Sequence, residues 1–437
     1  MSPWSGQPDG LQATRECYNS RRRSPAVRIL VLTSSYPKYP GDTTAPFIQS
    51  ITRELASRGH ELSVVLPARA DLDLAPVKGV SFQPYHYAPS ERLAVFGYAQ
   101  GLRGDVAVRG STYLVSPLAL LSGARKMMTA VRRGGYHLVH AHWVVPNGAM
   151  ALPAAWVGGL PLVVSLHGSD VFLSEKKRLF RRAARLVFQR AAAVTACSDD
   201  LADRSQRLGA SPRPVVIPYG VDAEFFRPQP EEVARLRERL GLGDGQPMVL
   251  AVGRLVHKKG FEILVKAMPR LVARHPELKV VIAGGGDLAA SLAEQAAGAG
   301  VRDHLMLVGR VRREELPAYY GAATVTAVPS MHDDAGNVDG LPNVMLEALA
   351  SGSPVVASAV AGIEQAVSHG KDALLVAERD PEALANALLE LLGSRDRREA
   401  LGRKARERAR SAFHWGRVGE QFEDVFRTVT RSGGAAT

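Results

Sequence analysis

The sequence predicts an α/β protein of two domains, each with a parallel sheet covered by helices. A chain of 437 residues is too long for one ordinary hydrophobic core. Short apolar runs alternate with amphipathic segments, as in doubly wound parallel sheets. The composition changes between 227 and 247, where a charged segment with Pro and Gly at both ends suits a linker. We therefore expect a leader at 1–25, domains at 26–228 and 229–410, and a last helix and tail at 411–437.

The composition also narrows the class of protein. Lys and Arg outnumber Asp and Glu by 55 to 43, and the net charge of +12 favours phosphorylated small molecules, nucleic acid or an acidic membrane as partners. A generally basic surface would give the same balance. Two cysteines, Cys17 and Cys197, argue against a disulfide framework and suit a reducing cytoplasm. Residues 1–25 lack the apolar core of a secretory signal and are expected to be disordered.

In the first domain, the apolar run at 26–33 predicts a buried strand, and ELSVVLP at 61–67 predicts the next. The amphipathic segment between them, FIQSITRELASRGH, predicts a helix. The same pattern recurs in four later runs: HLVHAHW (137–143), PLVVSLHG (161–168), AAVTACS (192–198) and RPVVIPYG (213–220). The stretch from Trp143 to Leu166 carries no charge, but its prolines and glycines favour a buried helix and a strand over a membrane span.

The second domain repeats this organisation after the linker. Its apolar runs are PMVLAVGRL (247–255), LKVVIAGGG (278–286), HLMLVGRV (304–311), ATVTAVPS (323–330) and SPVVASAV (353–360). Each run is followed by a turn or a helical pattern. Two α/β domains of similar size therefore face each other, and a cleft between domains is where a ligand usually binds.

A candidate phosphate site follows the first strand of the second domain. The loop VHKKG opens into a helix, so Arg254, Lys258 and Lys259 stand beside the N–H groups of a helix start. The alternative is that the three cations are solvated surface side chains that bind no ligand. The next strand ends in three glycines around Gly285, where a planar or phosphorylated ligand can approach the backbone. A tight turn is the alternative.

Two acids lie in the segment DGLPNVMLEALASG. Gly340 would permit an unusual turn, Pro342 suits the first helical position and Gly352 can end the helix. Asp339 precedes the positive end of the helix dipole, as an N-terminal cap or as a functional acid. Glu347 lies inside an apolar helix, where a carboxylate needs partners. Its two oxygens match the two hydroxyls of a ribose, and a buried ion pair with an arginine is the alternative.

Polar residues also gather at strand ends in the first domain. The motif HGSD places His167 and Asp170 at the carboxyl end of a parallel strand, which is the usual ligand edge of such sheets. HAHWVVPNG places His140, His142 and Trp143 at a neighbouring strand end. A histidine at such a position can also be a capping or core residue. The chain has no HExxH or clustered Cys/His pattern, so no metal site is expected.

The chain resembles the retaining glycosyltransferases of family 4 in several motifs taken together: GRLVHKKG, VVIAGGGDL, DGLPNVMLEALASGSPVVAS, HGSD and VIPYGVD. The resemblance extends from about Val27 to Thr430. It implies the GT-B architecture, with two facing Rossmann-like domains, an interdomain cleft and a last helix that crosses back to the first domain. It also implies transfer of a hexose-type sugar from a UDP- or GDP-sugar to a hydroxyl acceptor, such as a lipid-linked saccharide, polysaccharide precursor or other glycoconjugate. No cofactor or metal is expected.

The resemblance assigns roles to individual residues. The segment from Asp339 to Glu347 matches the family's E-x7-E signature, so the first acid would touch the donor sugar and the second would hold the ribose. Arg254 and Lys259 would grip the diphosphate, and His167 would hydrogen-bond the transferred sugar near its 6-hydroxyl. The catalytic set implied is His167, Arg254, Lys259 and Asp339. The further donor contacts implied are Gly41, Gly285, Val311 beside the base, and Gly340, Leu341, Pro342 and Asn343 near sugar hydroxyls or phosphate. The acceptor-side candidates are His142, Trp143 and Asp170.

Three departures from the family pattern stand out. Asp339 is shorter than the usual Glu, which moves its carboxylate by about one methylene and could change the sugar accepted. In the loop YPGDTTAPF, Gly41 remains, but Asp42 and Thr43 replace the usual glycine pair, which places phosphate binding from that side in doubt. Tyr219 stands where the family's VIPNGVD has Asn, and the sequence suggests no consequence.

The charge that develops when the sugar is transferred indicates how the reaction would proceed. Breaking the anomeric C–O bond leaves negative charge on the diphosphate, which Arg254, Lys259 and the helix start would oppose. The sequence identifies no carboxylate nucleophile. We therefore expect a same-face displacement, in which the leaving phosphate oxygen helps deprotonate the acceptor.

Two features concern larger surfaces. The amphipathic last helix, 413–429, would hinge the two domains, unless it packs on its own domain alone. The basic stretches 124–133 and 176–190 carry apolar positions between cations, as do helices that touch anionic lipid. Core-packed helices with basic outer faces would look the same. The expected location is cytoplasmic, with peripheral contact at the inner face of an anionic membrane.

Other functions were weighed against this one. A nucleotide-sugar epimerase or a phosphorylase shares the architecture, but the pyridoxal-bearing lysine of a phosphorylase is not recognisable. A non-catalytic scaffold or nucleotide sensor would explain the substituted acid at 339. No nucleic-acid partner is expected, because the chain has no recognisable binding module and only 6% aromatic residues.

Overall fold

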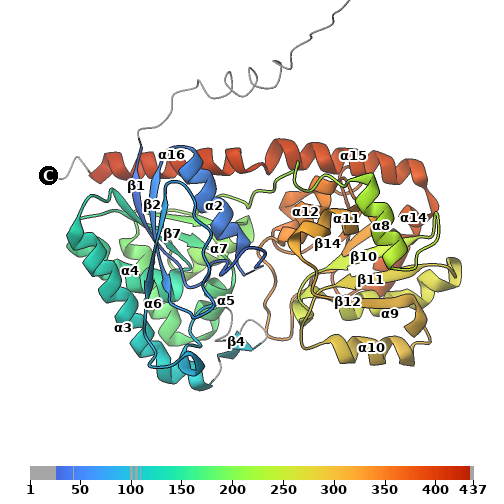
Figure 1. The fold of residues 1–437 in the computed structure, drawn as a ribbon, viewed down its shortest axis with the longest axis horizontal. Coiled ribbons are helices and arrows are strands. Elements are labelled where there is room, and N and C mark those ends of the chain that lie inside the picture. The colour runs from blue at the N-terminus through green and yellow to red at the C-terminus, as the bar shows by residue number, and fades with distance from the viewer. Residues whose placement is uncertain (1–25, 43, 99–101, 104–106, 109, 434–437) are drawn as a thin grey trace, which may run out of the picture.

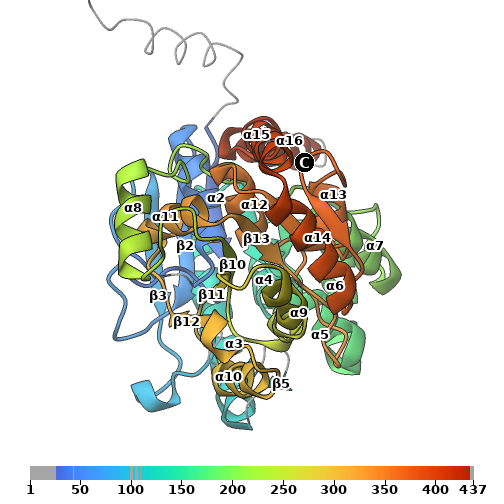
Figure 2. The same cartoon turned by 90° about the vertical axis from the view of Figure 1, so that its right-hand side faces the viewer.

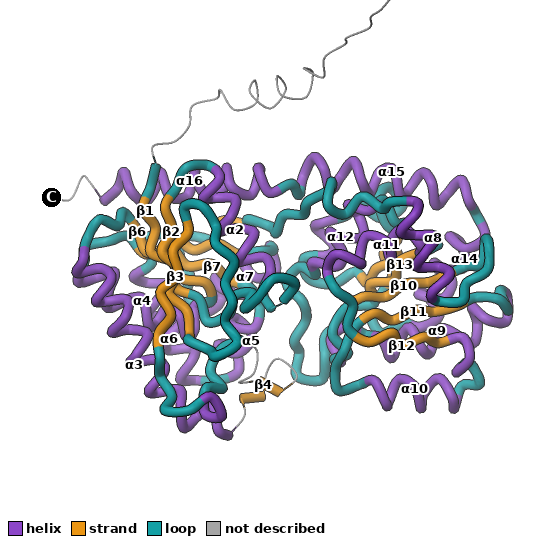
Figure 3. The backbone as a smooth tube through the Cα atoms, in the orientation of Figure 1, coloured by secondary structure: helices purple, strands orange, loops and turns teal. Residues whose placement is uncertain are grey.

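The computed structural model describes residues 26–433, apart from 43, 99–101, 104–106 and 109, and has two α/β domains (Figure 1). The predicted leader at 1–25 and the last four residues of the predicted tail lie outside the described residues. Figure 3 shows the two sheets as separate stacks of strands. The predicted fold class, with two Rossmann-like domains, is confirmed.

The first domain is built on a seven-stranded sheet in the order β3-β2-β1-β6-β7-β8-β9, and all neighbouring strands are parallel. The strands are β1 (Arg28–Leu32), β2 (Glu61–Pro67), β3 (Val80–Tyr85), β6 (Leu138–His142), β7 (Leu162–Leu166), β8 (Ala193–Ala196) and β9 (Val215–Val216). Strand β3 was not predicted, because this edge strand is mostly half-exposed and lacks an apolar run. Strand β9 is shorter than its apolar run because Pro214 and Pro218 flank it.

Helices cover both faces of this sheet. They are α2 (Pro46–Ser57), α3 (Gly110–Arg133), α4 (Ala149–Val157), α5 (Ser169–Lys176), α6 (Arg178–Arg190) and α7 (Asp199–Leu208), and a small antiparallel pair, β4 (Leu102–Arg103) and β5 (Ala107–Val108), lies outside the sheet. Helix α7 begins where the Ser198 hydroxyl accepts a hydrogen bond from the Leu201 N–H, and it ends at Gly209 in the left-handed conformation. The uncharged stretch after Trp143 forms α4 and β7, as predicted. Within the described residues, no helix combines the length and the apolar character needed to cross a membrane.

The second domain has a six-stranded parallel sheet in the order β12-β11-β10-β13-β14-β15. The strands are β10 (Met248–Val252), β11 (Lys279–Ala283), β12 (Leu305–Gly309), β13 (Val325–Val328), β14 (Val355–Ser358) and β15 (Leu374–Val376). The helices are α8 (Pro230–Arg239), α9 (Phe261–Arg274), α10 (Ala289–Gly298), α11 (Leu316–Ala322), α12 (Asn343–Ser351), α13 (Ile363–Ala366), α14 (Pro381–Gly393), α15 (Arg395–Ala412) and α16 (Trp415–Gly433). Strand β15 was not predicted, since three residues are too few for a pattern.

The segment predicted as a linker is part of the second domain. Its helix α8 packs on α11, and Leu236 is buried. The Arg237 guanidinium donates to the backbone oxygens of Ala322 at 3.2 Å and Gln246 at 2.8 Å. The charged face of α8 suggested a linker. In the structure, buried Leu236 and the hydrogen bonds of Arg237 hold the helix on the second domain.

The two faces of the second sheet differ in what covers them, because successive side chains of a strand point to opposite faces. Val249 and Ala251 of β10 belong to a core that includes residues of α9 and α14. Leu250 belongs to another core that includes residues of α11 and α12 and extends into the first domain. The end-on view of Figure 2 shows α9 and α14 together on one side of the strands and α8, α11 and α12 toward the other. The functional segment around α12 therefore lies in the core that joins the domains.

The C-terminal helices connect the domains, as the predicted crossing helix requires. Helix α15 contacts α12 and α14 of the second domain, and α16 contacts α2 of the first. Figure 1 shows the two helices end to end along one side of both domains. The residues of α16 buried in the first domain are Val418, Phe422, Val425, Phe426 and Val429. The alternative, packing of the last helix on its own domain alone, is excluded.

Candidate active site

Asp339 forms ion pairs with two lysines of the loop after β10. Its Oδ1 lies 2.8 Å from Lys258 Nζ, and its Oδ2 lies 2.5 Å from Lys259 Nζ. Gly260 fixes the lysine loop, because a Cβ there would lie 1.8 Å from the Pro329 carbonyl oxygen. Burial alone would raise the pKa of the Asp339 carboxyl, but the two ammonium groups hold the pKa well below its usual range. The acid is therefore ionised and is held against the cations predicted to bind phosphate.

Glu347, on α12, has a tyrosine as its hydrogen-bond partner. The Tyr320 hydroxyl, from α11, donates to Glu347 Oε2 at 3.0 Å. Burial raises the pKa of the Glu347 carboxyl, and the Tyr320 hydrogen bond and the charges of Arg313 and Lys259 only partly offset it. The alternative partner predicted from the sequence was an arginine. Tyr320 was not predicted, because nothing distinguishes it within the apolar pattern of α11.

The start of α12 differs from the prediction. The N-terminal cap position is Pro342 rather than Asp339, the helix begins at Asn343, and Gly352 ends it with a φ of 72° as expected. Gly340 does not adopt a positive φ. It is needed for a close contact instead, because a Cβ there would lie 2.7 Å from Leu201 Cδ1 and 3.0 Å from a cysteine sulfur of the first domain.

The three glycines after β11 serve the packing of two loops. A Cβ on Gly284 would lie 1.7 Å from the Gly253 carbonyl oxygen, and one on Gly286 would lie 2.5 Å from the Leu255 carbonyl oxygen. At Gly285 a Cβ would approach only the side chain of an arginine. The tight-turn alternative thus accounts for the outer two glycines, and a ligand contact at Gly285 stays a prediction.

The remaining donor-side residues surround this segment. Leu341 is buried in the core shared by the two domains, and Val311, after β12, packs partly buried against the same core. Pro342 is buried, Asn343 is half-buried, and Arg254 is exposed on the loop after β10. The structure therefore gathers the predicted donor residues of the second domain around the lysine loop and the start of α12. Their contacts with a nucleotide sugar stay predictions.

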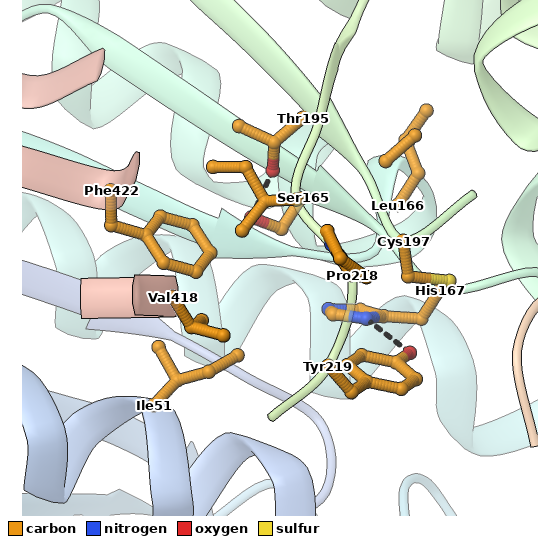
Figure 4. A pocket seen from close by; sticks show the side chains of 12 residues that line it. Ile51, Ser165, Leu166, His167, Thr195, Cys197, Pro218, Tyr219, Val418 and Phe422 are labelled. Atoms are coloured by element: carbon orange, nitrogen blue, oxygen red, sulfur yellow. Dashed lines mark hydrogen bonds between the residues drawn. The ribbon is translucent and has the colours of Figure 1, made fainter. Parts of the chain in front are cut away.

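His167 lies across the domain boundary in a cage of aromatic rings. Its Nδ1 lies 2.9 Å from the Tyr219 hydroxyl oxygen (Figure 4). Its Nε2 lies 3.0 Å from His142 Nδ1. The rings of Phe47 and Trp143 lie at centroid distances of 4.8 Å and 5.1 Å. Burial, with a smaller contribution from a neighbouring histidine, lowers the pKa of His167 to about 3. His167 is therefore neutral at physiological pH, and both ring nitrogens have protein partners.

The acceptor-side candidates differ in how much of each side chain is exposed near His167. His142 is fully buried behind it. Asp170 is buried too, and its carboxylate accepts hydrogen bonds from the N–H groups of Val144 at 2.8 Å and Gly168 at 3.0 Å. Trp143 is half-exposed and has a φ of 70°, a strained conformation for this residue type that often marks functional sites. Of the three, Trp143 has side-chain surface to offer an acceptor, and that contact stays a prediction.

The loop before α2 is closed by one of the residues that depart from the family pattern. The Asp42 carboxylate accepts hydrogen bonds from the N–H groups of Lys38 at 2.9 Å and Thr44 at 3.1 Å. Gly41 has a φ of 86° and open space around it, while Thr43 lies outside the described residues. Phosphate binding from this side therefore stays a prediction at Gly41.

Several contacts join the two halves of the site. The Asp199 N–H of the first domain donates to Gln365 Oε1 of the second at 2.9 Å. Across the domain boundary, Lys176 Nζ donates to Asn337 Oδ1 at 3.3 Å. The cavity behind His167, drawn in Figure 4, has about 10 Å³, which is space for no more than a water molecule. A sugar would therefore have to lie on the other side of His167. Among the described residues, no group of three or more acids, histidines and cysteines is placed to hold a metal.

The known proteins that this chain resembles are glycosyltransferases. Residues 45–225 match the family described as Glycosyltransferase Family 4, and residues 232–408 match Glycosyl transferases group 1. The chain is 31% identical to the GDP-mannose-dependent alpha-(1-6)-phosphatidylinositol monomannoside mannosyltransferase of Mycolicibacterium smegmatis, over 91% of this chain and 97% of the relative. It is also 31% identical to the D-inositol 3-phosphate glycosyltransferase of Acidothermus cellulolyticus, over 87% of this chain and 84% of the relative.

The fold also matches solved structures. The crystal structure of the Anabaena protein HepE in complex with UDP superposes with a TM-score of 0.72 at 20% sequence identity, over 92% of this chain and 100% of that chain. At this identity the likeness bears on the fold alone, and it places the two domains and the crossing helix among GT-B structures. The sequence relatives, the two family matches and the fold together establish that the chain belongs to glycosyltransferase family 4 and is a glycosyltransferase with the GT-B architecture.

Proposed function

We propose that this enzyme transfers mannose from GDP-mannose to a hydroxyl of a phosphatidylinositol-linked mannoside or a related lipid-linked acceptor, with retention at the anomeric carbon. The names of relatives with 30 or 31% identity over most of the chain support this donor and acceptor. The observation that carries the proposal is the ionised Asp339, held by two lysines at the start of α12, across the domain boundary from His167. A UDP-sugar is the alternative donor, since HepE was solved with UDP.

The charges of the site suit a nucleoside diphosphate sugar. Lys258 and Lys259 carry two positive charges and share the single negative charge of Asp339, so the three groups together keep one positive charge. A donor diphosphate would bring further negative charge beside them and beside the positive end of α12. Asp339, with two acceptor oxygens, would then accept hydrogen bonds from sugar hydroxyls. Arg254 and Lys259 would stabilise the departing diphosphate, each on the order of 10²-fold in turnover. In this proposal side chains and a helix start supply the positive charge, and the enzyme needs no metal ion.

The other residues complete the proposed donor site. The Glu347 carboxylate would accept hydrogen bonds from both ribose hydroxyls. The hydrogen bond from Tyr320 already orients this carboxylate. The acceptor hydroxyl would attack from the face that the diphosphate leaves, and the departing phosphate oxygen would take its proton. This same-face displacement requires no protein nucleophile and gives retention.

An anionic membrane surface is the proposed location of the acceptor. Six of the nine large apolar side chains that the described residues expose lie on three adjacent helices of the first domain, α3, α4 and α6. They are Leu118, Leu121, Trp156, Val157, Leu179 and Leu186. Helix α6, RLFRRAARLVFQR, adds five arginines and no acid. Apolar side chains among cations favour an interfacial contact with anionic lipid.

The experiment for the donor is calorimetric titration of the purified protein with GDP and UDP, followed by transfer assays with GDP-mannose and vesicles that contain phosphatidylinositol monomannoside. We expect GDP to bind at least about tenfold more tightly than UDP, a difference of about 1.4 kcal/mol, and the product to carry an α-mannosidic linkage by NMR. Tighter binding of UDP would show that the donor is a UDP-sugar. Nucleotide binding without transfer to any lipid acceptor would contradict the proposed acceptor. Absence of binding to either nucleotide would contradict the proposal as a whole.

A further inference from the structure

Tyr219, one of the departures from the family pattern, contacts the centre of the predicted sugar site. It lies in the loop after β9, only 6% exposed, and its ring stacks on Phe47 with a centroid distance of 4.6 Å and an interplanar angle of 25°. Its hydroxyl oxygen lies 2.9 Å from His167 Nδ1. The asparagine of the family is several bonds shorter, so from the same backbone its amide would not reach the imidazole.

The proton positions in this cluster are constrained by the two histidines behind the tyrosine. His142 Nδ1 and His167 Nε2 face each other at 3.0 Å. A neutral imidazole has one nitrogen that donates and one that accepts, so a hydrogen bond between two rings requires the accepting ring to be neutral, while the donating ring can be neutral or protonated. Burial lowers the pKa of both groups, which agrees with a neutral pair. One ring must donate and the other must accept, and the choice fixes which nitrogen of His167 carries its proton.

The surroundings of His142 favour one direction for the hydrogen bond between the two histidines. His142 Nε2 has no hydrogen-bond partner among the described residues. If His167 donated from Nε2, His142 Nε2 would carry a buried N–H without an acceptor, and orphaned buried N–H groups are rare. If His142 donates from Nδ1, only a lone pair is left unsatisfied there. His167 then carries its proton on Nδ1 and donates to the Tyr219 hydroxyl oxygen at 2.9 Å.

We propose that Tyr219 is a positioning residue for His167: its hydroxyl oxygen accepts the hydrogen bond of the Nδ1 N–H, which stabilises the Nδ1-protonated tautomer and fixes the ring with Nε2 as a hydrogen-bond acceptor. The chain of hydrogen bonds then runs from His142 through His167 to Tyr219. A sugar hydroxyl that approaches Nε2 would donate to it in competition with His142. The proposal rests on the proposed function for its kinetic consequence, and the tautomer itself can be measured without turnover.

The test is nitrogen-15 NMR of the ring nitrogens in histidine-labelled protein, with the His167 signals assigned by their loss in His167→Asn. In the wild type we expect a protonated Nδ1 and an unprotonated Nε2 at His167. Tyr219→Phe keeps the ring stacked on Phe47 and removes only the hydroxyl. We expect it to shift His167 to the other tautomer or to a mixture, and to lower kcat for mannose transfer about tenfold while donor affinity stays the same.

The matched control is Tyr87→Phe, another buried tyrosine of the first domain, whose hydroxyl bonds the backbone of Phe96 and not His167. It should leave both the His167 spectrum and kcat unchanged. A wild-type spectrum with Nε2 protonated, or a Tyr219→Phe spectrum equal to that of the wild type, would overturn the inference. A changed tautomer with unchanged kcat would overturn the positioning role. If the wild type transfers no sugar from any donor, the proposed function fails while the spectra still decide the tautomer.

Discussion

At the scale of single residues, the two acids of the α12 segment have opposite surroundings. Asp339 faces two ammonium groups and has a lowered pKa, whereas Glu347 faces a tyrosine hydroxyl and has a pKa raised by burial. A lowered pKa means that the ionised form is stabilised by the fold, and a raised pKa means that ionisation costs stability. The fold thus stabilises the ionised form of Asp339 and is destabilised by ionisation of Glu347. Such a cost is typical of a residue retained for a ligand.

Glu347→Gln should therefore raise stability while it weakens nucleotide binding. The folded pKa lies above the reference value of 4.5, so the folded state binds the proton more tightly, and ionisation destabilises it as the pH rises past that pKa. At pH 7 we expect an equal or higher free energy of unfolding, with the difference from wild type vanishing below about pH 4. Nucleotide affinity should fall about tenfold, because an amide offers a ribose one acceptor oxygen instead of two.

Urea unfolding at several pH values and calorimetry with GDP measure both quantities. The matched control is Glu364→Gln, at an exposed position of α13, which should change neither. Unchanged GDP affinity in Glu347→Gln would remove Glu347 from the donor site.

At the scale of elements, the start of α12 depends on one missing Cβ. Gly340→Ala would place a methyl group 2.7 Å from Leu201 Cδ1, on a helix of the other domain. The domains would have to separate by some tenths of an ångström, and we expect the loss of stability to be about 1–3 kcal/mol. Because small misplacements of reacting groups are costly, turnover should fall at least about tenfold. Activity assays and thermal unfolding measure the two effects.

Gly298→Ala is the control for this variant, since Gly298 ends α10 with open space around it. It should be neutral or slightly stabilising. Wild-type activity in Gly340→Ala would show that the close contact between Gly340 and α7 has no part in catalysis.

Helix α16 should contribute to stability in proportion to its buried face. Phe422 is 3% exposed in the core that α16 shares with α2, so Phe422→Ala should lower the free energy of unfolding by about 3–5 kcal/mol. Glu420→Ala, on the exposed face of the same helix, should change it by less than about 0.5 kcal/mol. Denaturant unfolding compares the two variants. Equal effects would mean that α16 is not held by its apolar face.

At the scale of the whole molecule, charge and apolar surface are distributed unevenly. The net charge is +12, and most of the exposed large apolar side chains lie on α3, α4 and α6 of the first domain. The predicted donor residues at the start of α12 belong to the second domain. This arrangement would let the first domain rest on a membrane that holds the acceptor while the second domain binds a water-soluble donor.

Co-sedimentation with vesicles tests this arrangement. We expect the protein to bind vesicles of anionic phosphatidylglycerol and to remain in solution with neutral phosphatidylcholine, and 0.5 M salt should weaken the binding. Leu179→Glu, at a side chain that is 76% exposed on α6, should lower recovery with anionic vesicles severalfold. Val215→Glu, at an exposed position of β9, is the control. Equal recovery with both lipids would contradict the proposed membrane contact.

Much of the fold was predictable because its signals are local. Buried parallel strands are continuous apolar runs, and the strands β1, β6, β7, β10 and β11 were located in this way. The strands missed, β3 and β15, are a half-exposed edge and a three-residue segment, which leave no such run. The segment 227–247 was predicted as a linker with a helical middle, because nothing local in it shows that Arg237 bonds the backbone of Ala322, 85 residues away.

The sequence by itself determined the two-domain α/β organisation and the order of the motifs that mark a family 4 glycosyltransferase, because periodicity and motif spacing are properties of neighbouring residues. Only the tertiary structure decided which groups meet across long distances. It paired Asp339 with Lys258 and Lys259, gave Glu347 the Tyr320 hydroxyl, and assigned Gly340 to a close contact instead of a turn. It also brought Tyr219 to His167. Such pairings depend on how the sheets and helices pack, and no local pattern encodes them.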